Sequence, residues 1–366
     1  MQPIPVHTVV MYPRPHPDNI AALWLLQEFG TELFPGIREV AFDFWNQVPP
    51  GKTAEQWEAE GYLLIDIGGG RFDHHHDGHQ MDTTTCATTL VARYLGVDQR
   101  PELKKLLEFV RRDDLEGRGI VSKDVIDRAF GLSAIVMNLN RDYPGNPEFV
   151  IDSVMRIFHA HYNEEYRRKV VMPKEWEELK REGRAVQFDI DTPSGPLRVV
   201  MMESDSKTMV GFVRAVKDIM ADVVVQRQST GHTNIVTRQT QGAPKLDLRP
   251  LLAAIRRAEA QKKGMDVSRL TAADWEKPRR LEGIDEWYFD IAANTIQNGG
   301  AATANISPTQ LGMEEIQHML TDILPTVVSR GGSVQRQSPT GRPTGTNRGM
   351  SLDDLRRGKV DIRPLR

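Results

Sequence analysis

The sequence predicts an α/β protein in which an N-terminal domain with a parallel sheet is followed by a smaller α+β domain. Short apolar runs at Val6–Tyr12, Val40–Trp45 and Leu63–Ile65 alternate with helical patterns, as expected for βαβ units. From Ala185 onward, strand-like runs follow one another, the last two with a hairpin signal between them, which is typical of a mixed sheet. These runs are Val186–Asp191, Leu197–Met202, Ala221–Gln228 and Asn234–Arg238. A chain of 366 residues is long enough for two such domains.

The first strand and helix bring a histidine and an aspartate to one loop. Val6–Tyr12 is apolar enough to form a buried strand, and a proline-rich loop ends it. Asp18 or Asn19 can cap the helix that follows over Ile20–Phe29. His16 and Asp18 therefore lie at the carboxyl end of the first strand. Helix capping alone would account for Asp18, whereas His16 has no such structural reason.

The stretch Leu63–Gly78, LLIDIGGGRFDHHHDG, is the most informative part of the chain. Its apolar run predicts a third strand that places Asp66 at its carboxyl end. Three glycines then allow a tight turn in which the backbone can approach a ligand, and Asp73, His74 and His75 follow. Such a loop at the end of a parallel strand is typical of a metal site, although a solvated loop or a fortuitous zinc-binding stretch would have the same composition.

An acidic pair follows the end of a later predicted helix. The helix Glu102–Arg111 carries its apolar residues on one face, and Asp113 and Asp114 come after it. Negative charge at a helix C-terminus opposes the helix dipole. Either the adjacent Arg111 and Arg112 compensate this charge, or a bound cation does.

Changes in composition divide the chain into four parts. The candidate site residues described so far fall in an N-terminal domain over residues 1–150, and a charged helical stretch over 151–185 is predicted to be an exposed connector. Strands and helices over 186–328 form the predicted second domain. Residues 329–366 are rich in Gly, Ser, Pro, Thr and Arg, which predicts a basic, disordered tail.

The bulk composition excludes several classes of protein. A net charge of −3 and a pI of about 6.4 give no whole-chain case for nucleic-acid binding, although a local basic groove remains open. The single Cys86 excludes an intrachain disulfide framework and a CxxC zinc site. No apolar run is long enough for a membrane span and the N-terminus lacks a secretory signal, so we expect a cytoplasmic protein with no membrane association.

Carboxylate and imidazole groups gather at the predicted strand and helix ends. They are His16, Asp18, Asp66, Asp73, His74, His75 and Asp114. Oxygen and nitrogen donors without thiolates favour Mn²⁺ or Mg²⁺ over a structural zinc. We expect one or two such ions. Two of them, bridged by one carboxylate, can bind a phosphate and supply hydroxide for in-line attack. The residues therefore predict phosphoester hydrolysis.

The same residues resemble a known family. Asp73-His74-His75 after Asp66 is similar to the signature of the DHH phosphoesterase superfamily. The sequence IDIGG at Ile65–Gly69 resembles its melanocyte-proliferating-gene (MYG) branch, whose members are described as metal-dependent 3′→5′ exonucleases. The resemblance covers roughly residues 6–325. It implies a DHH-type N-terminal domain and a DHH-associated-like substrate-binding domain after it.

The resemblance also implies a role for each candidate ligand. Asp66 would bridge two metal ions, with His16 at one of them. The other ion would be completed by Asp18, His74 and Asp114.

The remaining roles concern catalysis and the substrate. His75 would contact the scissile phosphate or assist proton transfer, and Asp73 would orient its neighbours. The other end of the substrate would be held in the second domain by Gly299, Gly300, Arg238 and Arg227.

The chain departs from the family at one ligand. Where the family has a His five residues before the position of His16, this chain has Met11, and a thioether is a poor ligand for Mn²⁺ or Mg²⁺. Asp113 could also take the place of Asp114. The functional hypothesis is an exonuclease acting on RNA, DNA or short oligonucleotides, with a homodimer left open as its assembly. The alternatives are a hydrolase of a small nucleotide-like phosphoester and a catalytically weakened nucleic-acid-binding homologue.

Overall fold

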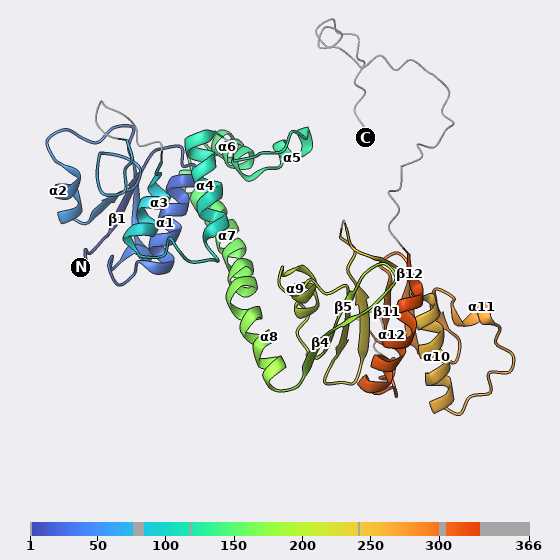
Figure 1. Cartoon of the computed structure of the whole chain (residues 1–366). Helices are drawn as coiled ribbons and strands as arrows, with labels where there is room; N and C mark the ends of the chain where they lie inside the picture. The colour runs from blue at the N-terminus through green and yellow to red at the C-terminus, as the bar shows by residue number, and fades with distance from the viewer. Residues whose placement is uncertain (1, 76–83, 118, 241, 300–304, 330–366) are drawn as a thin grey trace, which may run out of the picture. The chain divides into compact units, whose positions relative to one another are not determined.

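The computed structural model describes residues 2–75, 84–117, 119–240, 242–299 and 305–329 (Figure 1). Packing divides the chain into two compact units, the first holding residues 1–187, 200–220 and 226–229 and the second holding the rest. The strands form a parallel sheet near the N-terminus and a separate, larger sheet after it. The prediction of a mixed α/β protein with a parallel first sheet is therefore confirmed.

The first sheet has the strand order β2-β1-β3 and both of its pairings are parallel. Its strands are β1 (Thr8–Met11), β2 (Ala41–Phe44) and β3 (Tyr62–Leu64). Thr8 of the central strand is in register with Ala41 on one side and Tyr62 on the other. The chain therefore leaves β1 toward one neighbour and returns to its other side, which makes the carboxyl end of β1 the switch point where α/β sheets bind ligands.

Alternation along β1 supplies apolar side chains to both faces of the sheet. Val9 and Met11 are buried in the larger core, whereas Val10 belongs to a smaller cluster with Ala54 of helix α2 (Ala54–Ala59). Helix α1 (Pro17–Phe29) packs against α3 (Ala87–Tyr94), α4 (Lys104–Glu116) and α7 (Pro147–Tyr166) (Figure 1). Since α1 is surrounded by helices, its residues from Pro17 to Leu26 are all buried.

Helix α7 belongs to this core for most of its length. Val150, Val154 and Phe158 are buried among the core side chains, and Tyr162 packs against Trp24 at 5.2 Å between ring centroids. This packing places one face of residues 151–162 in the first core, where the sequence predicted an exposed connector over 151–185. The chain then continues through a π-helical segment, η2, into another helix, α8. These elements span Arg167–Val171 and Met172–Arg181.

Helix α4 is longer than predicted. It runs to Glu116 and ends at Gly117, whose φ of 58° is in the left-handed region typical of a helix C-cap. Asp113 and Asp114 therefore lie inside its last turns and not beyond its end. Arg111 pairs with Glu108 and Glu116 and Arg112 pairs with Glu108, so of the two alternatives for the acidic pair the ion pairs do not support compensation by these arginines. The remaining helical elements of this region are η1 (Ile37–Glu39), α5 (Val125–Ala129) and α6 (Leu132–Asp142).

The second sheet has seven strands in the order β4-β5-β6-β7-β11-β10-β9, and its β7-β11-β10-β9 half is antiparallel. They are β4 (Ala185–Ile190), β5 (Leu197–Glu203), β6 (Val223–Arg227), β7 (Thr233–Thr237), β9 (Arg279–Leu281), β10 (Ile284–Asp290) and β11 (Thr295–Gln297). The sequence predicted the first four of these strands and missed the others, two of which are only three residues long and carry little periodic signal. Among the described residues this sheet has seven strands and the first sheet has three, although the second unit holds fewer residues than the first.

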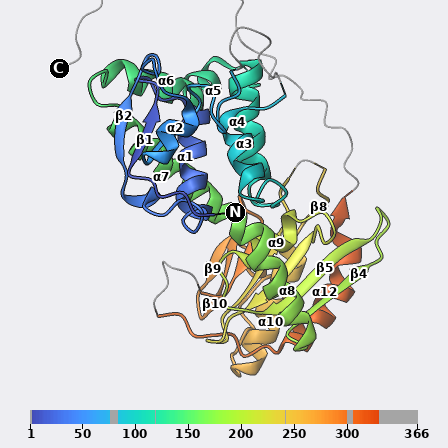
Figure 2. The same cartoon turned by 90° about the vertical axis from the view of Figure 1, so that its left-hand side faces the viewer.

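Helices cover the second sheet. Helix α10 (Arg249–Lys262) packs against α12 (Met313–Val327) and β10 (Figure 2). Two shorter helices are α9 (Met209–Ala215) and α11 (Ala272–Trp275). A separate two-stranded sheet pairs β8 (Lys245–Leu246) with β12 (Val328–Ser329). Within the described ranges, none of the helices is both long and apolar enough to cross a lipid bilayer.

Candidate metal centre

The loop after β3 is held in a strained, compact conformation. Asp66 adopts a φ of 63°, which is uncommon for a residue other than glycine, and such backbone conformations cluster at functional sites. Gly68 and Gly69 also have positive φ values, of 83° and 69°. The Asp66 N–H donates to the Phe72 carbonyl at 3.0 Å, which closes the loop. The residues after Phe72 are thereby returned to the end of the strand that carries Asp66.

Asp73 stabilises this loop from within. One of its carboxylate oxygens accepts from the Gly69 N–H at 2.7 Å, and the other accepts from the His75 N–H at 2.9 Å. The second oxygen also lies 2.9 Å from His75 Nδ1. Asp73 therefore orients His75, and its oxygens are already occupied by the loop.

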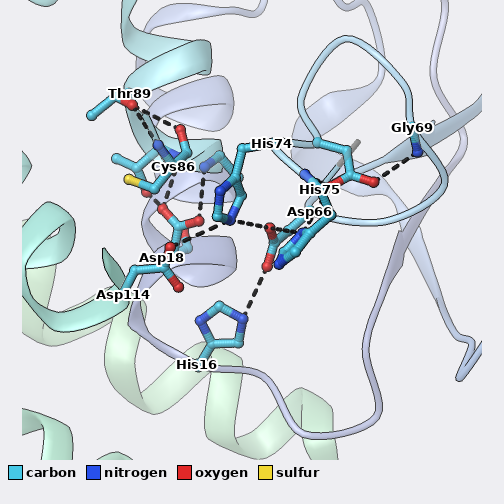
Figure 3. Close-up of polar contacts among 12 residues, drawn as sticks. His16, Asp18, Asp66, Gly69, His74, His75, Cys86, Thr89 and Asp114 are labelled. Atoms are coloured by element: carbon cyan, nitrogen blue, oxygen red, sulfur yellow. Dashed lines mark hydrogen bonds and ion pairs between the residues drawn. The ribbon is translucent and has the colours of Figure 1, made fainter. Parts of the chain in front are cut away.

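The Asp66 carboxylate lies at the centre of the cluster (Figure 3). Its Oδ2 is 3.0 Å from His16 Nε2, and its Oδ1 is 3.4 Å from His74 Nε2 and 3.5 Å from His75 Nδ1. His74 Nε2 is also 3.3 Å from Asp114 Oδ2. The loop after β1, the loop after β3 and helix α4 thus bring their side chains to one place.

Two overlapping groups of ligand atoms could each hold a metal ion. Asp66, His74 and His75 form one group, and Asp18, His74 and Asp114 form the other, with the ligand atoms of each within 4.8 Å of one another. Asp66 and His74 are almost completely buried, with side chains 1% and 2% exposed. His75 and His16 are more open, at 46% and 37%.

The buried atoms of the cluster lack aligned hydrogen bonds. Within the described part of the chain, both carboxylate oxygens of Asp66, both ring nitrogens of His74 and Oδ2 of Asp114 are buried without a hydrogen-bond partner. Their mutual contacts are close enough for charge interaction but poorly aligned. Buried polar atoms are rarely left in this state, and a cation would satisfy the carboxylate oxygens and His74 Nε2 together. The donor set therefore fits a divalent metal.

The Asp18 carboxylate also accepts hydrogen bonds from another helix. The N-cap residue of α1 is His16, whose N–H donates to the Asn19 side chain at 3.0 Å, so Asp18 is not the cap of its own helix. Its two carboxylate oxygens instead accept from the N–H groups of Ala87 and Thr88, both at 2.8 Å. Asp18 thus holds the N-terminus of α3 while it faces the cluster.

Charge interactions shift the pKa values of the cluster. Burial would raise the pKa of Asp66, but contacts with His16 and His74 outweigh it and lower that pKa. Burial disfavours protonated His16, yet its contact with Asp66 raises the pKa of His16 to about 9. Burial and the charge of Asp18 raise the pKa of Asp114 to about 6, and burial and the charge of Asp66 raise that of Asp18. Without a cation, the cluster therefore holds protons that a metal would displace.

The protons held by the metal-free cluster predict how metal binding depends on pH. Imidazole must be neutral to ligate a metal, and His16, with a pKa of about 9, is protonated at neutral pH. Mn²⁺ affinity should therefore rise with pH, by about tenfold per pH unit for each proton displaced, between pH 6.5 and 8.5. Calorimetry in buffers of different ionisation enthalpy counts those protons. A His16→Gln variant should release fewer, and metal binding without proton release would contradict the proposed protonation.

Two other predicted residues have different surroundings. Asp113 accepts a hydrogen bond from Ser133 Oγ at 2.5 Å and belongs to neither metal-ligand group, so it is not placed to replace Asp114. Met11 is fully buried in the hydrophobic core, and its thioether contributes to packing.

The predicted substrate residues of the second domain are not brought together. The register pairs Gln297 with Asn234 and Thr295 with Val236, so Gly299 and Arg238 lie beyond opposite ends of β7. At about 3.3 Å per residue they are roughly 20 Å apart along the strand, which excludes a shared role at one group. The Arg238 guanidinium pairs with Asp222 at 2.5 Å.

The other two predicted substrate residues are Arg227 and Gly300. The Arg227 carbonyl accepts a hydrogen bond from the Ser204 N–H. Gly300 lies outside the described residues, as does the predicted tail from residue 330 onward.

Sequence reasoning missed Tyr12 and Arg14. The pKa of Tyr12 is raised by burial and by the charges of Asp66 and Asp73, which places its hydroxyl in the field of the cluster. Arg14 lines a cavity together with His16. Their position directly after the first strand, in the same loop as His16, was the available signal.

Comparison with known proteins assigns no family. No family model matches the chain, and no curated protein does either. A crystal structure of an uncharacterized protein from Helicobacter pylori G27 aligns over 87% of this chain and 99% of that chain, with 11% identity and a TM-score of 0.23. Similarity at that level supports no inference about fold or function.

Proposed function

We propose that the protein is a metal-dependent phosphohydrolase that releases nucleotides from the 3′ ends of RNA, DNA or short oligonucleotides. The observation that supports this most strongly is the set of buried, unsatisfied carboxylate and imidazole atoms on Asp66, His74 and Asp114. Such a set is costly without a cation and is typical of sites that bind divalent metals. The nucleic-acid substrate and the direction of cleavage rest on the resemblance to the DHH phosphoesterases.

The ligand set favours Mn²⁺ or Mg²⁺. The ions would be held by His16, Asp18, Asp66, His74 and Asp114, which offer oxygen and nitrogen but no sulfur. When bound, such a cation supplies Lewis-acid polarisation of the phosphate and favours attack by water. Met11 packs in the hydrophobic core, and the proposed set of ligands takes none from that position.

The chain's own residues supply position and proton transfer. Asp66, with its lowered pKa, stays ionised at neutral pH and can face the cationic groups of the site. His75 is nearly half exposed and Asp73 fixes its ring through Nδ1, so its other nitrogen is free to face a substrate. A histidine oriented in this way can accept a proton at its other nitrogen and, once doubly protonated, pass it to a leaving oxygen.

The test is hydrolysis by the purified full-length protein. We expect Mn²⁺-dependent release of mononucleotides from the 3′ end of a 5′-labelled oligonucleotide, and EDTA should abolish this activity. Asp66→Asn and Asp66→Ala should each abolish it. Asn keeps the side-chain shape and tolerates the left-handed backbone of Asp66, so this variant isolates the charge. Full activity in either variant, or activity that resists EDTA, would reject the proposal.

A further inference from the structure

A cavity of about 870 Å³ lies beside the candidate metal centre in the first unit. It begins at His16, whose Nε2 is 3.0 Å from Asp66. The loop after β1 and helices α5 and α6 supply much of its wall. The Asn140 side chain of α6 donates to the Pro15 carbonyl at 2.8 Å, so this wall is fixed to the loop that carries His16.

Three arginines line this cavity: Arg14, Arg128 and Arg141. Among the described residues, none of them makes an ion pair, and Arg141 makes only a side-chain contact with the Met137 sulfur at 3.5 Å. Asp113 also lines the cavity, but its Oδ1 is engaged by Ser133 Oγ. The cavity therefore has positive charge available next to an acidic cluster.

The lining favours one kind of ligand. Guanidinium groups bind phosphate through paired N–H donors more effectively than other cationic side chains do. Val136 and Met137 add apolar surface suited to a base or a ribose. A volume of about 870 Å³ lies within the range of small-molecule sites and exceeds the needs of a single phosphate.

We infer that this cavity, here called the arginine pocket, binds a phosphate group of the substrate other than the one being cleaved. The inference rests on the proposed function and narrows it to short nucleotide substrates that carry a terminal phosphate. The cleaved phosphodiester lies at the metal centre, and the terminal phosphate lies beyond His16 between the arginines. A long strand without a terminal phosphate would place no phosphate of that kind against the arginines of the pocket.

A comparison of two dinucleotides tests the substrate class. With Mn²⁺, the wild-type protein should have a kcat/KM about tenfold or more higher for a 5′-phosphorylated dinucleotide than for the same dinucleotide without the phosphate, since about 1.4 kcal/mol of added binding is tenfold. The double variant Arg128→Ala/Arg141→Ala should lose that preference. Arg156→Ala is the matched control, because Arg156 lies on an exposed face of α7 and pairs with Asp152. It should keep the preference.

A binding measurement separates this inference from the proposed catalysis. Calorimetric titration with adenosine 3′,5′-bisphosphate in EDTA should give a dissociation constant about tenfold weaker for the double variant than for the wild type. Equal binding by the two proteins, or no binding by the wild type, would overturn the arginine pocket even if Mn²⁺-dependent hydrolysis is observed. Arginine-dependent binding in a protein without hydrolysis would support the pocket while rejecting the enzyme.

Discussion

Asp114→Asn is expected to stabilise the metal-free protein at neutral pH while it weakens Mn²⁺ binding. Burial and the charge of Asp18 raise the pKa of Asp114 from its ordinary value of 3.8 to about 6. A carboxyl whose pKa is higher in the folded state binds its proton more tightly there, so ionisation costs stability as pH rises from about 4 to 6. Above pH 6 the full cost is present, on the order of 1–3 kcal/mol. Asn keeps the shape and removes the charge.

The measurement is urea denaturation in EDTA at pH 7.5 and at pH 4, together with Mn²⁺ titration. The gain in the free energy of unfolding should be present at pH 7.5 and should shrink toward pH 4. Mn²⁺ affinity should fall about tenfold or more. Asp113→Asn is the matched control, because that carboxylate accepts from Ser133 and gives no reason for a gain. Loss of stability in Asp114→Asn would mean that the ionised Asp114 carboxylate does not destabilise the metal-free protein. Unchanged Mn²⁺ affinity would mean that Asp114 is not a metal ligand.

The centre of the site could be predicted because it depends on local spacing and on one rule of topology. His16 and Asp66 each follow a recognisable apolar strand by a few residues, and His74 comes ten residues after the end of β3. In a parallel sheet the carboxyl ends of neighbouring strands share one edge, so loops after β1 and β3 meet. The glycines between Asp66 and His74 indicated the tight return of the loop.

The contacts between distant segments could not be predicted in this way. The carboxylate of Asp18 binds N–H groups 69 and 70 residues along the chain, and no local pattern marks that pairing. The end of α4 was misplaced because charged residues after Arg111 carry no apolar period, while Gly117 supplies the actual stop. Arg128 and Arg141 belong to no motif in the sequence, and only the fold places them at one cavity.

Asp18→Asn is expected to destabilise the metal-free protein, the opposite of Asp114→Asn. Both carboxylates are in one cluster, and burial and charge raise the pKa of each. They differ in their partners, since Asp18 accepts from two backbone N–H groups at the start of α3 whereas Asp114 Oδ2 has no hydrogen-bond partner among the described residues. An amide can accept from one of those N–H groups but presents its own N–H to the other. The buried donor left unpaired should cost about 1–3 kcal/mol.

Urea denaturation of both variants in EDTA at pH 7.5 measures this contrast, and amide hydrogen exchange localises it. In Asp18→Asn, the amides of Ala87 and Thr88 should exchange faster, because they lose a charged acceptor at a helix N-terminus. In Asp114→Asn their exchange should not increase. A stabilised Asp18→Asn protein with unchanged exchange would show that relief of charge repulsion outweighs the two hydrogen bonds. Asp18 would then be retained for the cation alone, and the position of α3 would depend on the packing of its apolar face against α1.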